Sequence, residues 1–237
     1  MDYISSCKEF GIELHTAQIA KFEDYYRLLV DWNEKMNLTA ITRKDEVYLK
    51  HFLDSVSVVR LLEDLNDRTL LDVGTGAGFP GIPLKILFPK AKITLMDSLS
   101  KRLKFLDTVI AELKLNEEGS IQTIHDRAED LAHKPSFREQ YDYVVSRAVA
   151  NLSTLSEYCL PFVRVGGSFI SYKSEKAKEE LEAAGKAIHL LGGDLIREDS
   201  FLLPGSDLSR TLIEIGKKEH TLEKYPRKAP LPSKMPL

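Results

Sequence analysis

The sequence predicts an α/β protein with a mostly parallel, seven-stranded sheet, helices on both faces of the sheet and a helical extension at the N-terminus. Three observations lead to this class. Apolar segments of strand length alternate with helical patterns over residues 69–171, the rhythm of βαβ units. A glycine-rich turn, Gly74 to Gly78, follows the first of these strands. Residues 1–68 instead carry the three- and four-residue periodicity of amphipathic helices.

The 237 residues divide into three expected segments. These are a helical extension at 1–68, an α/β domain at 69–218 and a basic, proline-rich tail at 219–237. Such a length can form one large domain, or one domain with an appendage. The net charge of −3 excludes a surface that attracts nucleic acid everywhere, so any contact with RNA must use local basic patches.

Composition also constrains the compartment and the ligands. Cys7 and Cys159 form no C-x-x-C pair and fit a reducing cytosol. No leader-like start and no stretch of transmembrane length is present, so we expect a cytoplasmic protein that does not contact a membrane. The six histidines show no metal-ligand spacing, so no metal is expected. Nothing in the sequence requires a dimer, and we expect a monomer.

Two helices are expected in the N-terminal extension. The first begins at an N-cap, Thr16, and continues to Met36, and the second spans Lys44 to Leu62. Two polar strings could contact a substrate: Trp32-Asn33 with Asn37-Leu38-Thr39, and His51-x-x-Asp54-Ser55. On residue type alone, core packing for Trp32 and helix capping or bridging for the polar groups are favoured.

The first strand of the α/β domain, Thr69–Val73, leads directly into Gly74, Gly76 and Gly78. Glycine tolerates φ > 0, and its missing Cβ lets a ligand approach the backbone. Strand, glycine turn and helix form the nucleotide-cradling start of a doubly wound domain. The turn has neither the Gly-Lys-Ser/Thr of a P-loop nor the glycine spacing of a dinucleotide site. Asp72 would disfavour a pyrophosphate and would suit a ligand with a cationic amino group.

The second strand, Lys92–Met96, ends at Asp97. An acid about 20 residues after the glycine turn, at the tip of the second strand, can accept both ribose hydroxyls of an adenosine. The alternative is a cap for the helix expected at Leu99–Leu113. The agreement in spacing with the upstream glycines favours the ribose role for Asp97.

The third strand, Ile121–Ile124, precedes a charged loop beside the second strand's end. There the backbone N–H of Ala128 could face an adenine nitrogen and Glu129 could accept from its amine, although a solvated loop is equally compatible. The fourth strand, Tyr141–Val145, precedes Arg147, which could stack on a base, grip a phosphate or pair with an acid such as Glu129.

The remaining elements close the domain. A fifth strand, Ser168–Tyr172, is followed by Lys173 and by a helix from about Glu175 to Leu191. Two segments around Leu195–Phe201 and Thr211–Ile215 resemble a closing hairpin.

The tail from Lys224 to Leu237 contains four prolines and no acid, so we expect it to be extended or disordered. Its basic residues Arg227 and Lys228, with Tyr225, suit a phosphate backbone and an exposed base. The alternatives are a solubilising tail and a strap that packs on the domain.

Taken together, these strings resemble the ribosomal small-subunit methyltransferase G family, also called glucose-inhibited division protein B. The resemblance implies the Rossmann-like methyltransferase fold. One departure lies in the tail, which reads Ala-Pro-Leu-Pro after Lys228 instead of a glycine-containing pattern. The matching stretches cover nearly the whole chain in order: Trp32-Asn33, Asn37-Leu-Thr39, Lys50-His-Phe-Leu-Asp-Ser55, Asp72-Val-Gly-Thr-Gly-Ala-Gly-Phe-Pro80, Asp97-Ser98, Lys101-Arg102, Arg127-Ala-Glu129, Ser146-Arg-Ala-Val-Ala150 and Lys224-Tyr-Pro-Arg-Lys228.

The resemblance implies an enzyme that methylates N7 of a guanine in 16S rRNA, near the decoding region of the ribosome. Its cofactor would be S-adenosyl-L-methionine, and its partner would be 16S rRNA or the small ribosomal subunit. Lys173, Arg227 and Lys228 are the expected RNA-binding residues. The expected cofactor-binding residues are Gly74, Gly76, Gly78, Phe79, Asp97, Ala128, Glu129 and Arg147.

No catalytic side chain is expected, because guanine N7 carries a lone pair and no proton, and the sulfonium is already electrophilic. The sequence agrees, since neither an Asn-Pro-Pro string nor a Pro-Cys nucleophile follows the fourth strand. Positive charge moves onto the purine during transfer, so Arg147 must be neutralised or aimed at the cofactor or a phosphate. Two rival classes stay open: a methyltransferase for a small molecule or a protein, and an RNA-binding module without chemistry. The glycine spacing disfavours a dinucleotide oxidoreductase.

Overall fold

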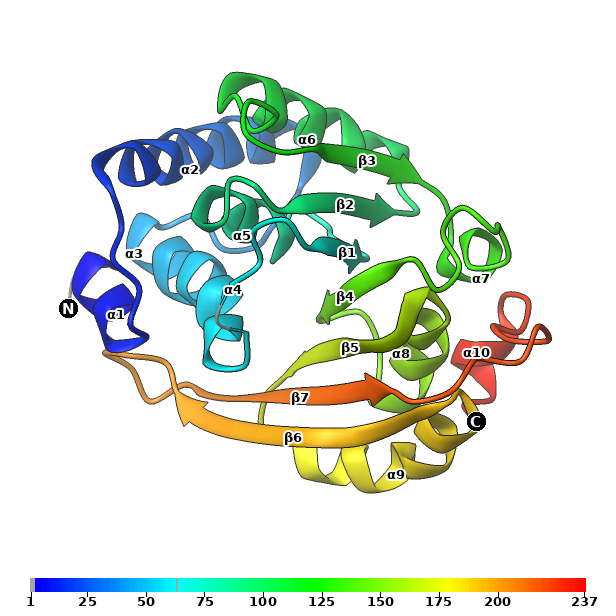
Figure 1. Cartoon of the computed structure of the whole chain (residues 1–237). Coiled ribbons are helices and arrows are strands. Elements are labelled where there is room, and N and C mark those ends of the chain that lie inside the picture. The colour runs from blue at the N-terminus through cyan, green and yellow to red at the C-terminus, as the bar shows by residue number, and fades with distance from the viewer. Residues whose placement is uncertain (1–2, 63) are drawn as a thin grey trace.

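The computed structural model describes residues 3–62 and 64–237. Its centre is a seven-stranded sheet in the order β3-β2-β1-β4-β5-β7-β6 (Figure 1). The five strands from β3 to β5 are parallel, and β7 runs antiparallel between β5 and β6. The predicted fold class is therefore confirmed. The strands are β1 Thr69–Val73, β2 Lys92–Asp97, β3 Ile121–His125, β4 Tyr141–Arg147, β5 Val163–Lys173, β6 Gly193–Leu202 and β7 Ser209–Lys217.

Every predicted strand is present, and most extend one or two residues further than expected. The largest difference is β5, which begins at Val163 instead of Ser168. Its register against β4 shifts between Tyr141 and Tyr143, so that Val163 and Ser168 face nearly adjacent partners. Gly166, with φ of +85°, lies inside this bulge. Gly166 and Gly167, which precede the expected start of this strand, therefore mark a bulge within it.

Helices cover both faces of the sheet (Figure 1). Along β1, Leu70 packs into one hydrophobic cluster and Leu71 into the other, because successive strand residues point to opposite faces. The first cluster includes the N-terminal helices with α5 and α6, and the second includes α7, α8 and α9. The helices are α1 Tyr3–Glu9, α2 Thr16–Met36, α5 Gly81–Leu87, α6 Ser100–Glu112, α7 Ala128–Leu131, α8 Leu152–Cys159, α9 Ala177–Leu190 and α10 Leu231–Lys234.

The N-terminal helices differ from the prediction in two details. Helix α2 is capped by His15, one residue before Thr16, and the His15 backbone N–H donates to the Gln18 side chain at 3.0 Å. The second helix is not a uniform α-helix. Between α3 (Lys44–Val47) and α4 (Asp54–Val56) it contains a π-helical segment, η1 (Tyr48–Leu53), and it ends in a 3₁₀ turn, η2 (Ser57–Arg60). Such π segments are frequent at functional sites.

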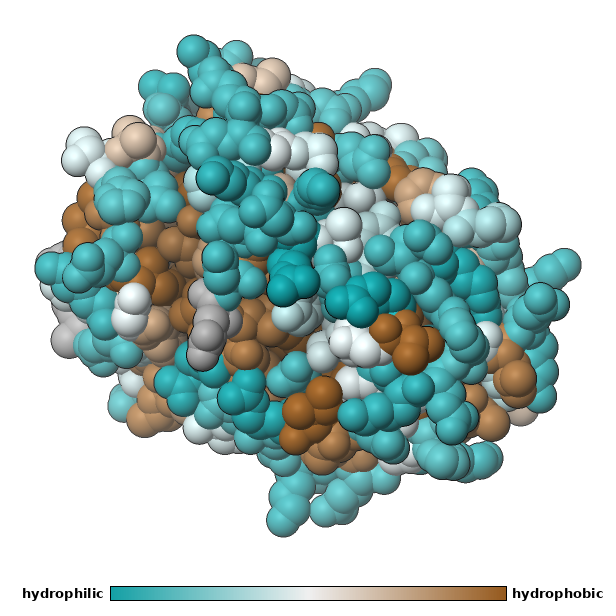
Figure 2. Space-filling view, in the orientation of Figure 1, coloured by the Kyte–Doolittle hydropathy of each residue, from teal (hydrophilic) through white to brown (hydrophobic). Residues whose placement is uncertain are grey.

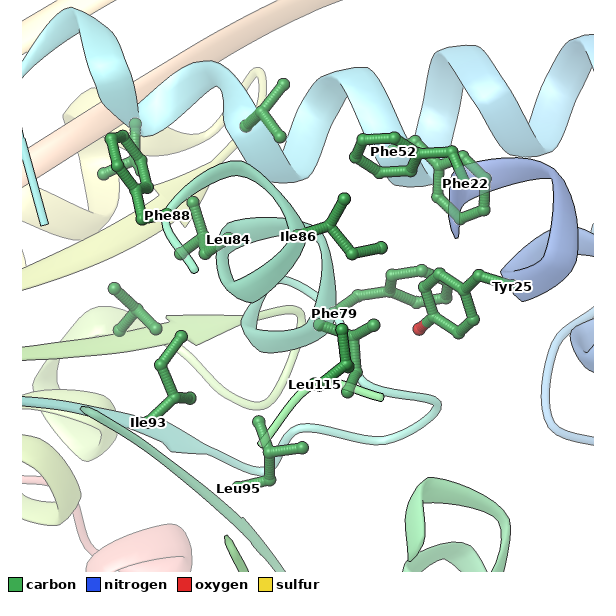
Figure 3. Close-up of a cluster of buried hydrophobic side chains, with 14 of the residues drawn as sticks. Phe22, Tyr25, Phe52, Phe79, Leu84, Ile86, Phe88, Ile93, Leu95 and Leu115 are labelled. Carbon is green, nitrogen blue, oxygen red and sulfur yellow. The ribbon is translucent and has the colours of Figure 1, made fainter. Parts of the chain in front are cut away.

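An aromatic cluster joins the N-terminal extension to the glycine turn (Figure 3). The ring of Tyr25 lies 5.6 Å from Phe79 and 5.2 Å from Phe52, measured between ring centres. The Tyr25 hydroxyl also donates to the carbonyl of Ala77, inside the turn. Helix α2 therefore holds the turn in place through both apolar contact and a buried hydrogen bond.

The tail is ordered, and the expectation of an extended or disordered segment is wrong. Tyr225 and Pro232 are buried against the second hydrophobic face, and the segment ends in the short helix α10. The guanidinium and backbone N–H of Arg227 donate to the carboxylate of Glu157, which is fully buried on α8. One buried acid thus anchors a segment that lacks the composition to form its own core. This is the alternative in which the tail packs as a strap.

The face seen in Figure 2 is mostly hydrophilic, with apolar surface on the left, where Figure 1 places α1, α2 and α3. An apolar cavity of about 720 Å³ lies in this region, lined by residues that include Ile19, Leu49 and Leu53. In the described part of the chain, no helix is long and apolar enough to cross a membrane.

Gly78 and Gly76 give a matched pair that tests how the turn is packed. A Cβ at Gly78 would lie 2.6 Å from Ile82 and 2.7 Å from the Tyr25 hydroxyl, and φ is +95°. A Cβ at Gly76 would meet open space, although φ is +62°. We expect Gly78→Ala to lower the free energy of unfolding by about 2–4 kcal/mol, through overpacking and strain. Gly76→Ala should lower it by only about 1 kcal/mol, through strain alone.

Urea unfolding of both variants measures this difference. Equal losses would contradict the packing assigned to Gly78.

Candidate active site

Two adjoining pockets lie at the carboxyl ends of β1, β2 and β4, where open α/β sheets bind ligands. The larger, of about 390 Å³, is lined by the glycine turn, Asp97 and Arg147. The smaller, of about 190 Å³, is lined by the loop after β3. They share Gly74, Asp97, Ser98 and Val149. A larger apolar cavity exists beside α1, but none of the predicted site residues lines it.

Asp72 lies beneath the glycine turn and holds its shape. One carboxylate oxygen accepts from the Thr75 hydroxyl at 2.7 Å and from the backbone N–H of Gly81 at 2.8 Å. The other oxygen is buried without a partner. The side chain is fully buried and lines neither pocket. The interpretation that Asp72 faces a cationic group of a ligand is therefore wrong in this structure.

Burial raises the pKa of Asp72 from its ordinary 3.8 to about 6, against the hydrogen bonds from Thr75 and Gly81 and the charge of Arg147, which lower it. An acid with a raised pKa in the folded state stabilises the fold when protonated. This stability is complete below pH 3.8 and is lost as the pH rises through about 6.

We therefore expect the wild-type protein to lose about 3 kcal/mol of stability from this group between pH 4 and pH 7. Asp72→Asn carries no titrating group and should lack this loss. The measurement is the free energy of unfolding against pH for both proteins, with the exposed Asp24→Asn variant as control. Parallel curves for wild type and Asp72→Asn would refute the assignment.

Asp97 joins the glycine turn to α6. Its carboxylate accepts from the backbone N–H of Gly76 and of Leu99, both at 2.9 Å, and pairs with Arg102 at 3.1 Å. Asp97 is not the N-cap of α6, which is Leu99, although its carboxylate holds the Leu99 backbone; it also lines both pockets. Its role toward a ribose stays a prediction.

The smaller pocket contains the residues predicted to contact an adenine. Ala128 begins α7, so its backbone N–H has no acceptor within that helix. Glu129 is buried and lines the same pocket, together with Met96 and Tyr158. A backbone donor and a carboxylate acceptor side by side match the edge of an aminated purine.

Arg147, at the end of β4, pairs with an acid from the N-terminal extension. Its guanidinium donates to Asp54 at 2.9 Å and to the carbonyl of Lys50 at 3.1 Å, and lies 5.2 Å from the centre of the Phe79 ring. The second Asp54 oxygen accepts from Arg210, on β7, at 3.0 Å. The alternative in which Arg147 forms a salt bridge is therefore observed, with Asp54 as the acid and not Glu129, the example that the sequence suggested.

His51, Phe79 and Arg147 together form one wall of the larger pocket. Its ring stacks on Phe79 with centres 4.6 Å apart, and its Nε2 lies 2.9 Å from the hydroxyl of Thr39. Burial, and then the charge of Arg147, lower the pKa of His51 to about 4. The imidazole is therefore neutral at pH 7 and adds no charge to the wall.

Sequence reasoning left His51 and Asp54 outside the site and favoured helix capping for them. The π-helical segment η1 ends at Leu53, and the string His51-x-x-Asp54 places both side chains against Arg147. The spacing of His51 and Asp54 can be recognised in the sequence. Their contact with Arg147 depends on how the N-terminal extension docks against β4, which local sequence does not predict.

The other predicted residues lie in three different settings. Gly78 packs under α2 and is not among the residues that line the two pockets. Lys173 is nearly buried and donates to the carbonyl of Ala150 and to Glu180. Arg227 is bound to Glu157, whereas Lys228 is exposed. RNA contact by these residues stays a prediction.

A family model for the rRNA small subunit methyltransferase G, GidB, matches residues 18–201. The chain belongs to this family. It is 51% identical over 235 residues to the ribosomal RNA small subunit methyltransferase G of Lachnoclostridium phytofermentans, covering 99% of this chain and 96% of that protein. It is 49% identical to the corresponding protein of Alkaliphilus metalliredigens, covering 98% and 95%. The family predicted from the motifs is confirmed.

Solved structures agree on the fold. A SAM-dependent O-methyltransferase from Thermotoga maritima matches with a TM-score of 0.51 at 14% identity, over 82% of this chain and 73% of that one. TYW2 from P. horikoshii, in complex with MeSAdo, matches with a TM-score of 0.52 at 14% identity, over 70% and 61%. These likenesses show that this chain shares its fold with both solved structures.

Proposed function

We propose that this protein transfers a methyl group from S-adenosyl-L-methionine to N7 of a guanine in 16S rRNA of the small ribosomal subunit. The observation that carries the proposal is the pair of joined pockets at the glycine turn, closed on one side by a wall of His51, Phe79 and Arg147. Close sequence identity to methyltransferases G over almost the whole chain supports the same reaction.

The residues present fit this cofactor. Around Gly76 the turn leaves open space where any other side chain would stand. Asp97, at the meeting point of the two pockets, offers a carboxylate for the ribose, and Ala128 with Glu129 offers a donor and an acceptor for the adenine. The methionyl part would occupy the larger pocket, beside Arg147. When bound, the cofactor supplies an electrophilic methyl group on its sulfonium.

The chain's own contribution is alignment and electrostatics. Guanine N7 needs no general base, and the neutral imidazole of His51 adds no charge that would oppose a cationic purine. Asp54, which Arg147 shares with Arg210, offsets part of the guanidinium's charge and fixes its position. Phe79 holds both side chains through stacking and helps to exclude water. Rate enhancement would come from proximity and orientation rather than proton transfer.

The remaining expectations belong to this proposal. The partner is 16S rRNA or the small subunit, the protein acts as a cytoplasmic monomer, and no metal takes part. Among the described residues, no group of three or more His, Cys, Asp or Glu side chains is arranged to hold a metal ion.

Variants of the neighbouring tail residues Arg227 and Lys228 distinguish a role in RNA binding from a role in protein stability. Arg227→Ala keeps the backbone donor of residue 227 but leaves the buried carboxylate of Glu157 without a cation, so we expect it to lower the free energy of unfolding by about 3 kcal/mol. Lys228→Ala removes an exposed cation and should leave stability unchanged while it weakens RNA binding at low salt. Chemical unfolding and salt-dependent RNA binding measure the two effects. Equal stability losses in the two variants would be inconsistent with the packed tail.

The deciding experiment is methyl transfer from labelled S-adenosylmethionine to small subunits and to free 16S rRNA from a strain that lacks this protein. We expect a single 7-methylguanosine in the digested product. Arg147→Ala should lower turnover at least tenfold, because it removes a side chain that lines the cofactor pocket and leaves one Asp54 oxygen without its donor. The exposed Arg43→Ala variant is the matched control. Cofactor binding without transfer to either RNA substrate would instead point to a small-molecule or protein acceptor.

A further inference from the structure

The larger of the two site pockets, with the glycine turn and Arg147 in its lining, is the cofactor pocket of the proposed function. A further cavity, of about 490 Å³, adjoins it on the other side of Arg147; we call it the third cavity because it lies next to the two site pockets. The two cavities share His51, Arg147 and Ala148. Neither the glycine turn nor Asp97 is among the described residues that line the third cavity. A ligand there would meet the cofactor only across the shared wall.

The lining of this cavity is charged, with more cations than carboxylates. Each oxygen of Asp54 already accepts from an arginine, so this carboxylate is not available to a ligand. A cavity with excess positive charge favours a ligand that carries a phosphate, as each nucleotide of RNA does. The charged side chains in the lining are Lys50, Arg147, Lys173, Arg210, Asp54 and Glu180.

Glu180, on α9, differs from Asp54 because one of its oxygens is free. Its Oε2 accepts from the backbone N–H of Leu152 at 2.8 Å and from the ammonium of Lys173 at 2.7 Å. No described residue donates to its Oε1, whereas both Asp54 oxygens accept from arginines. The carboxylate is therefore held in place with one acceptor unused.

We propose that this cavity receives the target guanine and that Glu180 accepts hydrogen bonds from its N1–H and 2-amino group. The inference rests on the proposed function. On a purine, N7 and the Watson–Crick edge lie on opposite sides. With N1 toward Glu180, which lines only the third cavity, N7 faces the wall shared with the cofactor pocket. Adenine would present an unprotonated N1 to the carboxylate and has no 2-amino group, so it is rejected.

The same contact strengthens during the reaction. As N7 bonds to the methyl carbon, the carbon–sulfur bond breaks and its electron pair stays on sulfur. The positive charge moves to the purine, which makes N1–H more acidic and its hydrogen bond to a carboxylate stronger. An interaction that is stronger in the transition state than in the ground state raises kcat. Glu180 therefore acts on turnover as well as on base binding.

Glu180→Gln tests the proposal, because the amide keeps an acceptor for Leu152 but loses the charge. Its neighbour Glu179, which is exposed and outside the cavity, gives the control Glu179→Gln. With small subunits that lack the methyl group, we expect Glu180→Gln to lower kcat about 10- to 100-fold, the range for losing a hydrogen bond to a charged group. Affinity for S-adenosylhomocysteine should match that of Glu179→Gln, whereas the melting temperature should be lower because the nearly buried Lys173 loses its charged partner. Wild type with bound S-adenosylhomocysteine should bind 5′-GMP more tightly than 5′-AMP, and Glu180→Gln should lose this preference.

Two results would overturn the inference while leaving the proposed function intact. One is equal turnover of Glu180→Gln and Glu179→Gln on the same subunits. The other is a loss of S-adenosylhomocysteine affinity as large as the loss of turnover, which would assign the cavity to the cofactor. Failure of the proposed function is a separate result, in which wild type forms no 7-methylguanosine. The comparison of GMP with AMP then still decides whether the cavity selects guanine.

Discussion

One buried carboxylate, that of Asp54, joins three parts of the chain at the candidate active site. It lies on the N-terminal extension and accepts from Arg147 on β4 and from Arg210 on β7. Two partly buried guanidinium groups side by side are stabilised by such a partner, because charges are costly away from water. The position of Arg147, and with it the wall between the cofactor pocket and the third cavity, depends on this three-way contact.

The glycine turn depends on a different set of buried groups. Asp72 accepts from Thr75 and Gly81 below the turn, while Tyr25 donates to Ala77 from the side of α2. The turn that would carry a cofactor is thus held from both ends by polar contacts inside an apolar cluster. Such contacts fix one arrangement, because breaking any of them would leave a buried polar group unpaired.

Much of the fold was predictable because its signals are local. Apolar strands, the glycine turn and helical periodicity each need only a few neighbouring residues to be recognised, and the strand at Thr69–Val73 has the bounds expected. The bulge in β5 was not predicted, since Gly166 resembles a turn when its partner strand is unknown. The tail was misjudged for a related reason. Its composition cannot form a core, but Arg227 reaches a buried acid 70 residues away in sequence.

The residues of the candidate site also fall into two groups, those that local sequence predicts and those whose position depends on the rest of the fold. Asp97, Ala128 and Glu129 follow strand ends, where sequence position alone places them at one edge of the sheet. His51 and Asp54 reach the site through the docking of a separate helical segment, and Asp72 turned inward because its hydrogen-bond partners are in the turn itself. The two residues positioned by tertiary contacts, His51 and Asp54, were therefore the ones that the sequence left open, whereas Asp72, held by local contacts, was given the wrong partner.

The bond between Arg227 and Glu157 connects the tail to the candidate active site. Glu157 is on α8, beside Tyr158, which lines the smaller pocket. A change in the tail that displaced Arg227 would leave a buried carboxylate without its cation next to a pocket-lining residue. The tail can therefore influence the adenine side of the site although none of its residues lines that pocket.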